Sequence, residues 1–216
     1  MCNLYAQTKS RDAMRQVFDP LLSGGEVFVD SLGNQPLKDQ IWPDYAAPII
    51  RAHPDGWQLT TARWGMPTPA FYLAGKKSDP GVTNIRNLGS AHWSRWLGVA
   101  HRCLVPFTSF SEPHHISKKP VWFGLGGQNP IGFFAGLRCE WTSVRKVKEG
   151  EVTAELFGFL TCAPNQKVGA VHPKAMPVIL TEPAQWRAWL SAPAAEALTL
   201  QRPLPDDLLE EIEEFR

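Results

Sequence analysis

Several common functional signatures are missing from this 216-residue sequence. It contains no P-loop, no other Gly-rich phosphate-binding loop and no G-x-S-x-G nucleophile motif, which argues against P-loop nucleotide hydrolases and α/β-hydrolases. Its four cysteines are widely spaced and form no C-x-x-C pair, so we expect neither a zinc site nor a disulfide scaffold. We therefore predict no metal and no cofactor, and thiols kept reduced in the cytoplasm.

Long apolar runs and a strong net charge are also missing. No stretch approaches the ~20 apolar residues that a membrane span needs, and no basic-then-apolar leader begins the chain. The net charge is only +1, so any contact with nucleic acid must depend on a local basic cluster. The length and the 44% hydrophobic content predict one domain over residues 1–216, acting as a monomer without membrane contact.

Nine tryptophans and nineteen prolines indicate many short elements and fixed turns. Residues 19–40 and 141–151 read as loops, and four helices are expected: after Thr8 or Ser10, after Ser90, from Pro183, and from Pro205 to Phe215. Extended segments are predicted at residues 2–6, 46–50, 57–64, 83–87, 101–107, 121–125, 131–137 and 155–162. We expect 121–125 and 131–137 to pair with each other. The fold class that follows is α+β, with an antiparallel, barrel-like sheet core and several peripheral helices.

The position of Cys2, directly after Met1, is the most informative feature. A small second residue usually allows removal of the initiator Met, which would leave a cysteine with a free α-amine of pKa about 8 and a thiol of pKa about 8.5. Such an amine attacks an aldehyde to give an imine, and the adjacent thiol closes on it to form a thiazolidine. The alternative is that Cys2 is a small apolar residue that begins a strand.

Three other polar residues lie in mostly apolar surroundings: Asn84, Glu112 and His172. A Glu near a core has a raised pKa and can act as an acid or base, and a His is the usual proton carrier near neutral pH. Each also has a structural alternative, as a turn residue, a surface carboxylate or a hydrogen-bonded core histidine. His114 and His115 are adjacent, the wrong spacing for two ligands on one helix face, and are expected in an exposed turn.

The order of several motifs resembles the SOS response-associated peptidase (SRAP) family, whose members process abasic sites in DNA. The resemblance runs from Cys2 to about Leu190. Its motifs, in order, are Met1-Cys2, Ala47-Pro48, Trp64 to Pro67, Asn84-x-Arg86, Cys103 to Glu112, and His172 with Met176-Pro177-Val178-Ile179-Leu180.

The resemblance implies the SRAP fold and a role in the SOS response to DNA damage. Cys2 would be the nucleophile that forms a covalent thiazolidine crosslink with a ring-opened abasic site in single-stranded DNA. Asn84 and Arg86 would hold the abasic sugar and a flanking phosphate, Glu112 would be the acid or base at the aldehyde, and His172 would transfer a proton at the sugar. Further expected DNA contacts are Trp64, Met66, Pro67 and Lys174.

The expected partners are single-stranded DNA with abasic sites and replication-fork proteins, in the cytoplasm at the nucleoid. Arg63 and Arg95 are expected to join Arg86 and Lys174 in neutralising phosphates.

The chain departs from the family pattern in three places. Leu4 replaces an Arg, Pro113 replaces an aromatic residue, and the tryptophans after Trp64-Gly65 are missing, with Phe71 and Tyr72 nearby. Stacking on an aromatic side chain contributes ~1–3 kcal/mol per base, so these changes affect DNA affinity more than the chemistry of Cys2.

The same residues are also compatible with two other functions. One is a thiol-dependent peptidase that uses Cys2 and His172 to remove its own Met1 or to cleave other proteins. The other is a single-strand-binding module without catalysis.

Overall fold

A closed barrel of five strands forms the centre of the described residues, which are 2–22, 24–33, 38–127 and 130–213 of a computed structural model. The strands, in barrel order, are β5 (Gly56–Trp64), β4 (Ala46–His53), β7 (Arg102–Phe107), β10 (Gly132–Val144) and β11 (Glu151–Cys162). Neighbours pair antiparallel around the ring. Parallel pairing of β11 with β5 closes it, which confirms the predicted barrel-like core.

Short strands extend this barrel at its edges. β2 (Val27–Asp30) pairs parallel with β5, and β6 (Asn84–Ile85) pairs parallel with β11. β12 (Met176–Pro177) and β13 (Ile179–Leu180) pair antiparallel with β11 and β10. β6 therefore fixes Asn84 opposite Phe159, at the edge of the barrel.

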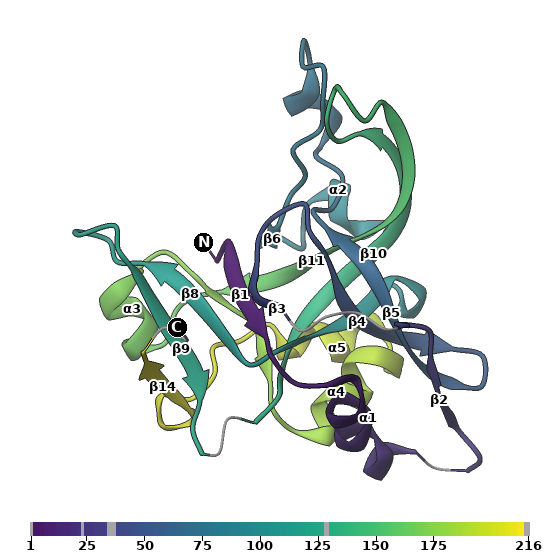
Figure 1. The fold of residues 1–216 in the computed structure, drawn as a ribbon, viewed down its shortest axis with the longest axis vertical. Coiled ribbons are helices and arrows are strands. Elements are labelled where there is room, and N and C mark those ends of the chain that lie inside the picture. Colours follow the sequence, from purple (N-terminus) through teal and green to yellow (C-terminus); the bar gives the residue numbers. More distant parts are fainter. Residues whose placement is uncertain (1, 23, 34–37, 128–129, 214–216) are drawn as a thin grey trace.

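A second sheet of five described strands lies beside the barrel (Figure 1). Its strands, in order, are β14 (Leu209–Ile212), β9 (Pro120–Leu125), β8 (Ser109–Pro113), β1 (Leu4–Gln7) and β3 (Lys38–Ile41). β1 runs between β8 and β3, with Leu4 opposite Ser111. Cys2, two residues before β1, therefore lies at the end of the sheet, next to β8.

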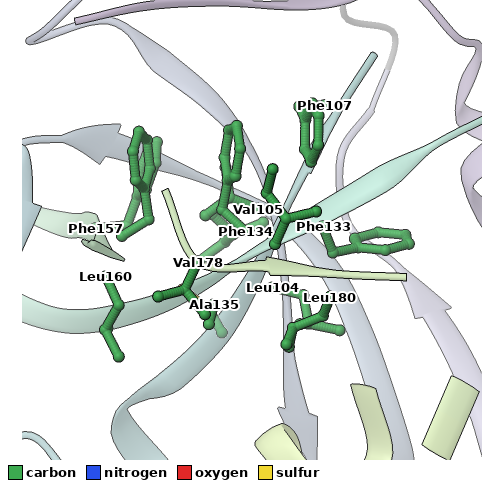
Figure 2. Close-up of a cluster of buried hydrophobic side chains, with 14 of the residues drawn as sticks. Leu104, Val105, Phe107, Phe133, Phe134, Ala135, Phe157, Leu160, Val178 and Leu180 are labelled. Atoms are coloured by element: carbon green, nitrogen blue, oxygen red, sulfur yellow. The ribbon is translucent and has the colours of Figure 1, made fainter. Parts of the chain in front are cut away.

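Aromatic side chains fill the space between strands (Figure 2). Phe107 and Phe134 stack with ring centroids 4.0 Å apart, and Trp64 stacks on Phe159 at 5.2 Å. All four are fully buried, and such pairs contribute ~0.5–1.5 kcal/mol beyond the burial of their area. The core therefore gives a rigid support to the strands that carry polar residues at their ends.

Helices cover the outside of the sheets, and their caps follow the sequence. Ser10 accepts a hydrogen bond from the Ala13 amide at the start of α1 (Arg11–Phe18), and Ser90 caps α2 (Ala91–Ser94) in the same way through His92. α4 (Pro183–Ser191) begins with a capping box of Glu182 and Gln185. The helices predicted after Ser10, after Ser90 and from Pro183 are thus confirmed. The remaining helices are α3 (Gln166–Val171), α5 (Ala194–Ala197), η1 (Asp19–Leu21), η2 (Ala70–Leu73), η3 (Val99–His101), η4 (Leu198–Leu200) and η5 (Asp206–Leu208).

The predicted helix from Pro205 to Phe215 is wrong for its described part. A single 3-10 turn, η5, is followed by β14, which pairs with the edge strand β9. Leu209, the first residue of β14, is buried, while Leu208, the last residue of η5, is 41% exposed. Phe215 lies outside the described residues.

Three other predictions also need correction. The segments 121–125 and 131–137 do not pair with each other: β9 pairs with β8 and β14, whereas β10 pairs with β7, β11 and β13. Residues 19–40 contain β2 and the start of β3, and β10 continues to Val144 before the chain turns. These strands form because they pair with strands that are distant in the sequence, and no local residue pattern indicates that pairing.

Residues 65–82 leave the barrel as an arm that rises beside the ends of β10 and β11 (Figure 1). Arg145 holds its base, because the guanidinium donates to the Gly65 carbonyl at 3.0 Å and to the Pro80 carbonyl at 3.3 Å. Gly65 and Gly81 have positive φ angles of 138° and 77°, and a Cβ at either would lie within 2.4 Å of the guanidinium. Only glycine fits this close approach.

In the part of the chain that the structure describes, no helix is long and apolar enough to cross a membrane.

Candidate functional site

The amino-terminal segment is fastened to β6 by Asn84. The Asn84 side-chain amide donates to the Cys2 carbonyl at 2.8 Å and to Thr83 Oγ1 at 2.8 Å, and it lies 3.4 Å from Asn3 Oδ1. Thr83 Oγ1 also donates to Asn3 Oδ1 at 3.2 Å. Asn84 Oδ1 is buried and has no hydrogen-bond partner among the described residues. Asn84 is therefore a fixed donor to the chain at Cys2, with one acceptor left for another group.

The Cys2 thiol is fully buried at the end of β1. Its Sγ lies 3.5 Å from the Leu4 carbonyl oxygen, to which the thiol donates. Burial raises the pKa of this thiol well above its ordinary value, and the neighbouring Glu112 carboxylate raises it further. The thiol is therefore protonated at neutral pH in this arrangement and needs a base before it can attack.

Glu112 and His172 lie side by side next to Cys2. Glu112 is fully buried near the end of β8, and His172 ends α3 with 8% exposure. Their closest atoms, His172 Nδ1 and Glu112 Oε2, are 3.7 Å apart, and Nδ1 is 3.1 Å from the Ala175 carbonyl oxygen. Because a carbonyl oxygen only accepts, Nδ1 is assigned the imidazole proton.

Burial sets the protonation of both side chains. It raises the pKa of Glu112 to about 7, although a hydrogen bond with the Cys2 backbone acts in the opposite direction. Burial also lowers the pKa of His172, which favours the neutral imidazole. A carboxyl group with a pKa near 7 can both give and take a proton at cellular pH, so Glu112 can act as a general acid and as a general base.

Arg86 and Lys174 form the exposed side of this region. Arg86 Nη1 donates to the carbonyl oxygens of Cys162 and Lys174, each at 2.9 Å, which fixes the guanidinium next to the loop that carries His172. Gln201 holds the backbone of the same residue, because its Nε2 donates to the Arg86 carbonyl at 2.8 Å and to the Thr161 carbonyl at 2.9 Å. The Arg86 guanidinium is therefore held in place and remains exposed to solvent.

Other residues expected to contact DNA lie elsewhere. Trp64, Met66 and Pro67 are buried, so their side chains support the barrel and the base of the arm. Arg63 pairs with Asp44 at 2.7 Å and with Glu149 at 2.9 Å, so its charge is already compensated.

Arg95, directly after α2, lies over the Trp96 ring at 5.0 Å. His114 and His115 form a turn, as predicted, with their rings stacked 5.0 Å apart.

The predicted residues Cys2, Asn84, Glu112 and His172 are therefore brought together from four distant segments. The sequence did not indicate that Asn3, Thr83 and Gln201 belong to this region. Asn3 and Thr83 contact Asn84, and Gln201 holds the backbone of Arg86. Thr83 adjoins Asn84 and could have been found from that position, whereas Gln201 acts across 115 residues and carries no local signal. No group of three or more His, Cys, Asp or Glu side chains gathers within the described ranges to hold a metal ion.

Comparison with known proteins identifies the family of this chain. Residues 1–213 match the profile of the SOS response associated peptidase (SRAP) family, and the chain belongs to that family. No curated protein matches the sequence significantly.

Solved structures show the same fold. A protein from Bordetella bronchiseptica is 23% identical with a TM-score of 0.68, covering 98% of this chain and 100% of its own. A phage-related protein from the same organism is 20% identical with a TM-score of 0.68, covering 98% and 93%. A protein from Bacteroides thetaiotaomicron is 19% identical with a TM-score of 0.66, covering 97% and 90%.

Proposed function

We propose that this protein captures abasic sites in single-stranded DNA as a covalent thiazolidine on Cys2, in the response to DNA damage. The observation that carries the proposal is that Asn84 and Glu112 both contact the Cys2 backbone, while His172 lies 3.7 Å from Glu112. An acid–base pair beside an amine and a thiol matches the needs of aldehyde capture, in which several protons move.

The reaction begins with removal of Met1, which makes the Cys2 nitrogen a primary amine. Protonated Glu112 gives a proton to the ring oxygen of the closed sugar while His172 takes one from the sugar hydroxyl, and the aldehyde opens. The amine attacks the aldehyde carbon, one water leaves, and an imine forms. The thiol then adds to the imine carbon, and its proton passes to the nitrogen through the Glu112 carboxylate.

Binding of the sugar and its phosphates follows from the remaining side chains. Asn84 Oδ1, buried and without a partner among the described residues, is available to accept a hydrogen bond from a sugar hydroxyl. Arg86 and Lys174 supply positive charge for the flanking phosphate, so binding weakens as salt rises.

A denaturing gel of purified protein incubated with abasic single-stranded DNA tests the proposal. We expect a covalent band that disappears in the Cys2→Ala variant. Cys139→Ala is the matched control, because Cys139 is also a buried thiol but lies within β10, opposite Leu156 of β11. A covalent band that persists in Cys2→Ala, or one that vanishes in Cys139→Ala, contradicts the assignment.

Removal of its own Met1 is a second candidate activity, favoured by the contact of Glu112 with the Cys2 backbone next to the peptide bond that must be cleaved. The Cys2 thiol would be the nucleophile and Glu112 the proton donor and acceptor. Intact mass of Cys2→Ala tests this, because alanine is also a small second residue that permits ordinary Met removal. Retention of Met1 in this variant supports self-processing, and its loss shows that another enzyme suffices.

A further inference from the structure

A groove of about 290 Å³ lies on the second sheet, close to the start of the chain. Register explains how it forms: Pro113 pairs with Pro120 between β8 and β9, and Leu4 pairs with Ser111 between β1 and β8. Its lining residues are Asn3, Leu4, Trp42, Ser111, Pro113, Lys118 and Pro120. The groove therefore crosses the end of the sheet from β9 to the residue that follows β3.

The walls of the groove suit a flat aromatic ligand with a nearby negative charge. Pro113, Pro120 and Leu4 give it apolar walls, and the indole of Trp42 forms another wall while remaining 41% exposed. Lys118 is the charged residue of the lining, and it is exposed. A nucleobase with its phosphate has this combination of a planar π-face and an anion.

Asn3 connects the groove to the candidate site. It lines the groove, and its Oδ1 accepts from Thr83 Oγ1 and lies next to the Asn84 amide. Cys2 is its chain neighbour. A DNA strand whose abasic sugar sits at Cys2 therefore reaches the groove with the adjacent nucleotide, passing over Asn3.

We propose that this groove binds the nucleobase next to the abasic site, stacked on Trp42, with Lys118 facing its phosphate. This inference rests on the proposed function and adds to it a subsite for the flanking nucleotide. Because stacking uses the π-face that all bases share, the subsite accepts any of the four bases.

The kinetics of crosslinking with a short abasic oligonucleotide test the subsite. We expect Trp42→Ala to raise the half-saturating DNA concentration about 5- to 150-fold, the range that loss of one base stack gives. The maximal rate stays unchanged, since Trp42 does not touch the reacting atoms. Trp42→Phe retains most of the affinity. Trp141→Ala is the matched control, because Trp141 is 39% exposed but lies on β10, outside the lining of the groove.

An oligonucleotide that lacks one flanking base separates stacking from a general loss of fold. A base-free tetrahydrofuran spacer replaces the flanking nucleotide on each side of the abasic site in turn. On the side whose base occupies the groove, the spacer weakens wild-type binding by the factor seen for Trp42→Ala and has no further effect on Trp42→Ala. The subsite is refuted if the spacer and Trp42→Ala weaken binding independently on both sides, so that their factors multiply. It is also refuted if Trp42→Ala behaves like Trp141→Ala.

Fluorescence anisotropy in the Cys2→Ala background distinguishes failure of the subsite from failure of the chemistry. This variant forms no thiazolidine, and non-covalent affinity for a labelled oligonucleotide still depends on Trp42. A wild-type protein that never forms a covalent band overturns the proposed function. Equal anisotropy affinities with and without the Trp42→Ala change overturn the subsite, whatever the gel gives.

Discussion

Two acidic residues of this protein, partly buried Asp44 and fully buried Glu112, have surroundings that give them opposite properties. Asp44 lies among three cations: Arg63 at 2.7 Å, Lys146 at 2.8 Å and Arg145 at 3.2 Å. Burial would raise its pKa, but hydrogen bonds from these side chains outweigh burial and hold the pKa well below its usual range. Glu112 lies beside a neutral histidine, and burial raises its pKa to about 7.

The difference separates a carboxylate that stays charged from a carboxyl group that can exchange its proton near neutral pH. Asp44 keeps its charge at all physiological pH values, and with Arg145 it fastens the base of the arm to the barrel. A Glu112 carboxyl with a pKa of about 7 changes its charge within the physiological range, which suits the proton transfers proposed for it. The predictions below either remove this difference or measure it.

The largest effect is expected for Glu112→Gln on the rate of crosslinking. Glutamine has nearly the same shape but cannot transfer a proton, so the single-turnover rate at saturating DNA should fall about 10²- to 10⁴-fold. Quench-and-gel time courses measure it. Glu149→Gln, in the Asp44 cluster, should leave the rate unchanged. An unaltered rate in Glu112→Gln would remove Glu112 from the mechanism.

The second prediction concerns stability without DNA. The carboxyl of Glu112 ionises less readily in the folded protein, so the folded state loses stability relative to the unfolded chain as pH rises from about 4.5 through about 7. At ~1.36 kcal/mol per pKa unit, wild type should lose about 3 kcal/mol relative to Glu112→Gln across this window.

Urea unfolding of both proteins at pH 5 and pH 8 measures the difference. The gap between wild type and Asp44→Asn should stay the same at pH 5 and pH 8, because a carboxylate with a lowered pKa stabilises the fold fully above its ordinary pKa of about 3.8 and loses this effect only in stronger acid. A pH-independent gap between wild type and Glu112→Gln would contradict the raised pKa of Glu112.

The third prediction addresses the structural cluster. Asp44→Asn leaves Arg63 and Arg145 short of a charged acceptor, which should lower the free energy of unfolding at pH 7 by about 1–3 kcal/mol. The crosslinking rate at saturating DNA should remain close to wild type. Chemical denaturation and the gel assay check the two parts, and a large loss of rate without loss of stability would show that the cluster belongs to the site.

The smallest effect is expected at Gln201. Gln201→Leu removes two hydrogen bonds that hold the backbones of Arg86 and Thr161, each contributing ~0.5–1.5 kcal/mol. We expect the half-saturating DNA concentration to rise several-fold and to become less sensitive to salt, because Arg86 is less well placed. Gln185→Leu, in the capping box of α4, is the control. Equal salt dependence in Gln201→Leu and wild type would mean that Arg86 needs no such support.

The residues of the candidate site could be predicted from the sequence. The family resemblance placed Cys2, Asn84, Glu112 and His172 in one site, and the structure brings these residues together. Helices also followed from local signals, since Ser10 and Ser90 cap within three residues of themselves. These hydrogen bonds join residues that are close in the sequence, so the sequence alone indicates them.

Features that depend on distant pairing could not be predicted. β14 exists because β9 offers it an edge, and Asn3 and Gln201 act on partners 80 to 115 residues away. Trp64 belongs to a family motif, but only the closed barrel shows that its ring stacks on Phe159 in the core. A motif indicates that a residue is needed and does not indicate which side of a strand it faces.

The most direct measurement is mass spectrometry of the amino-terminal peptide after incubation with abasic single-stranded DNA and nuclease digestion. We predict a peptide that begins at Cys2, without Met1, and carries the abasic sugar remnant with the loss of one water. An unmodified peptide that retains Met1, or a sugar adduct found on another residue, would contradict the account.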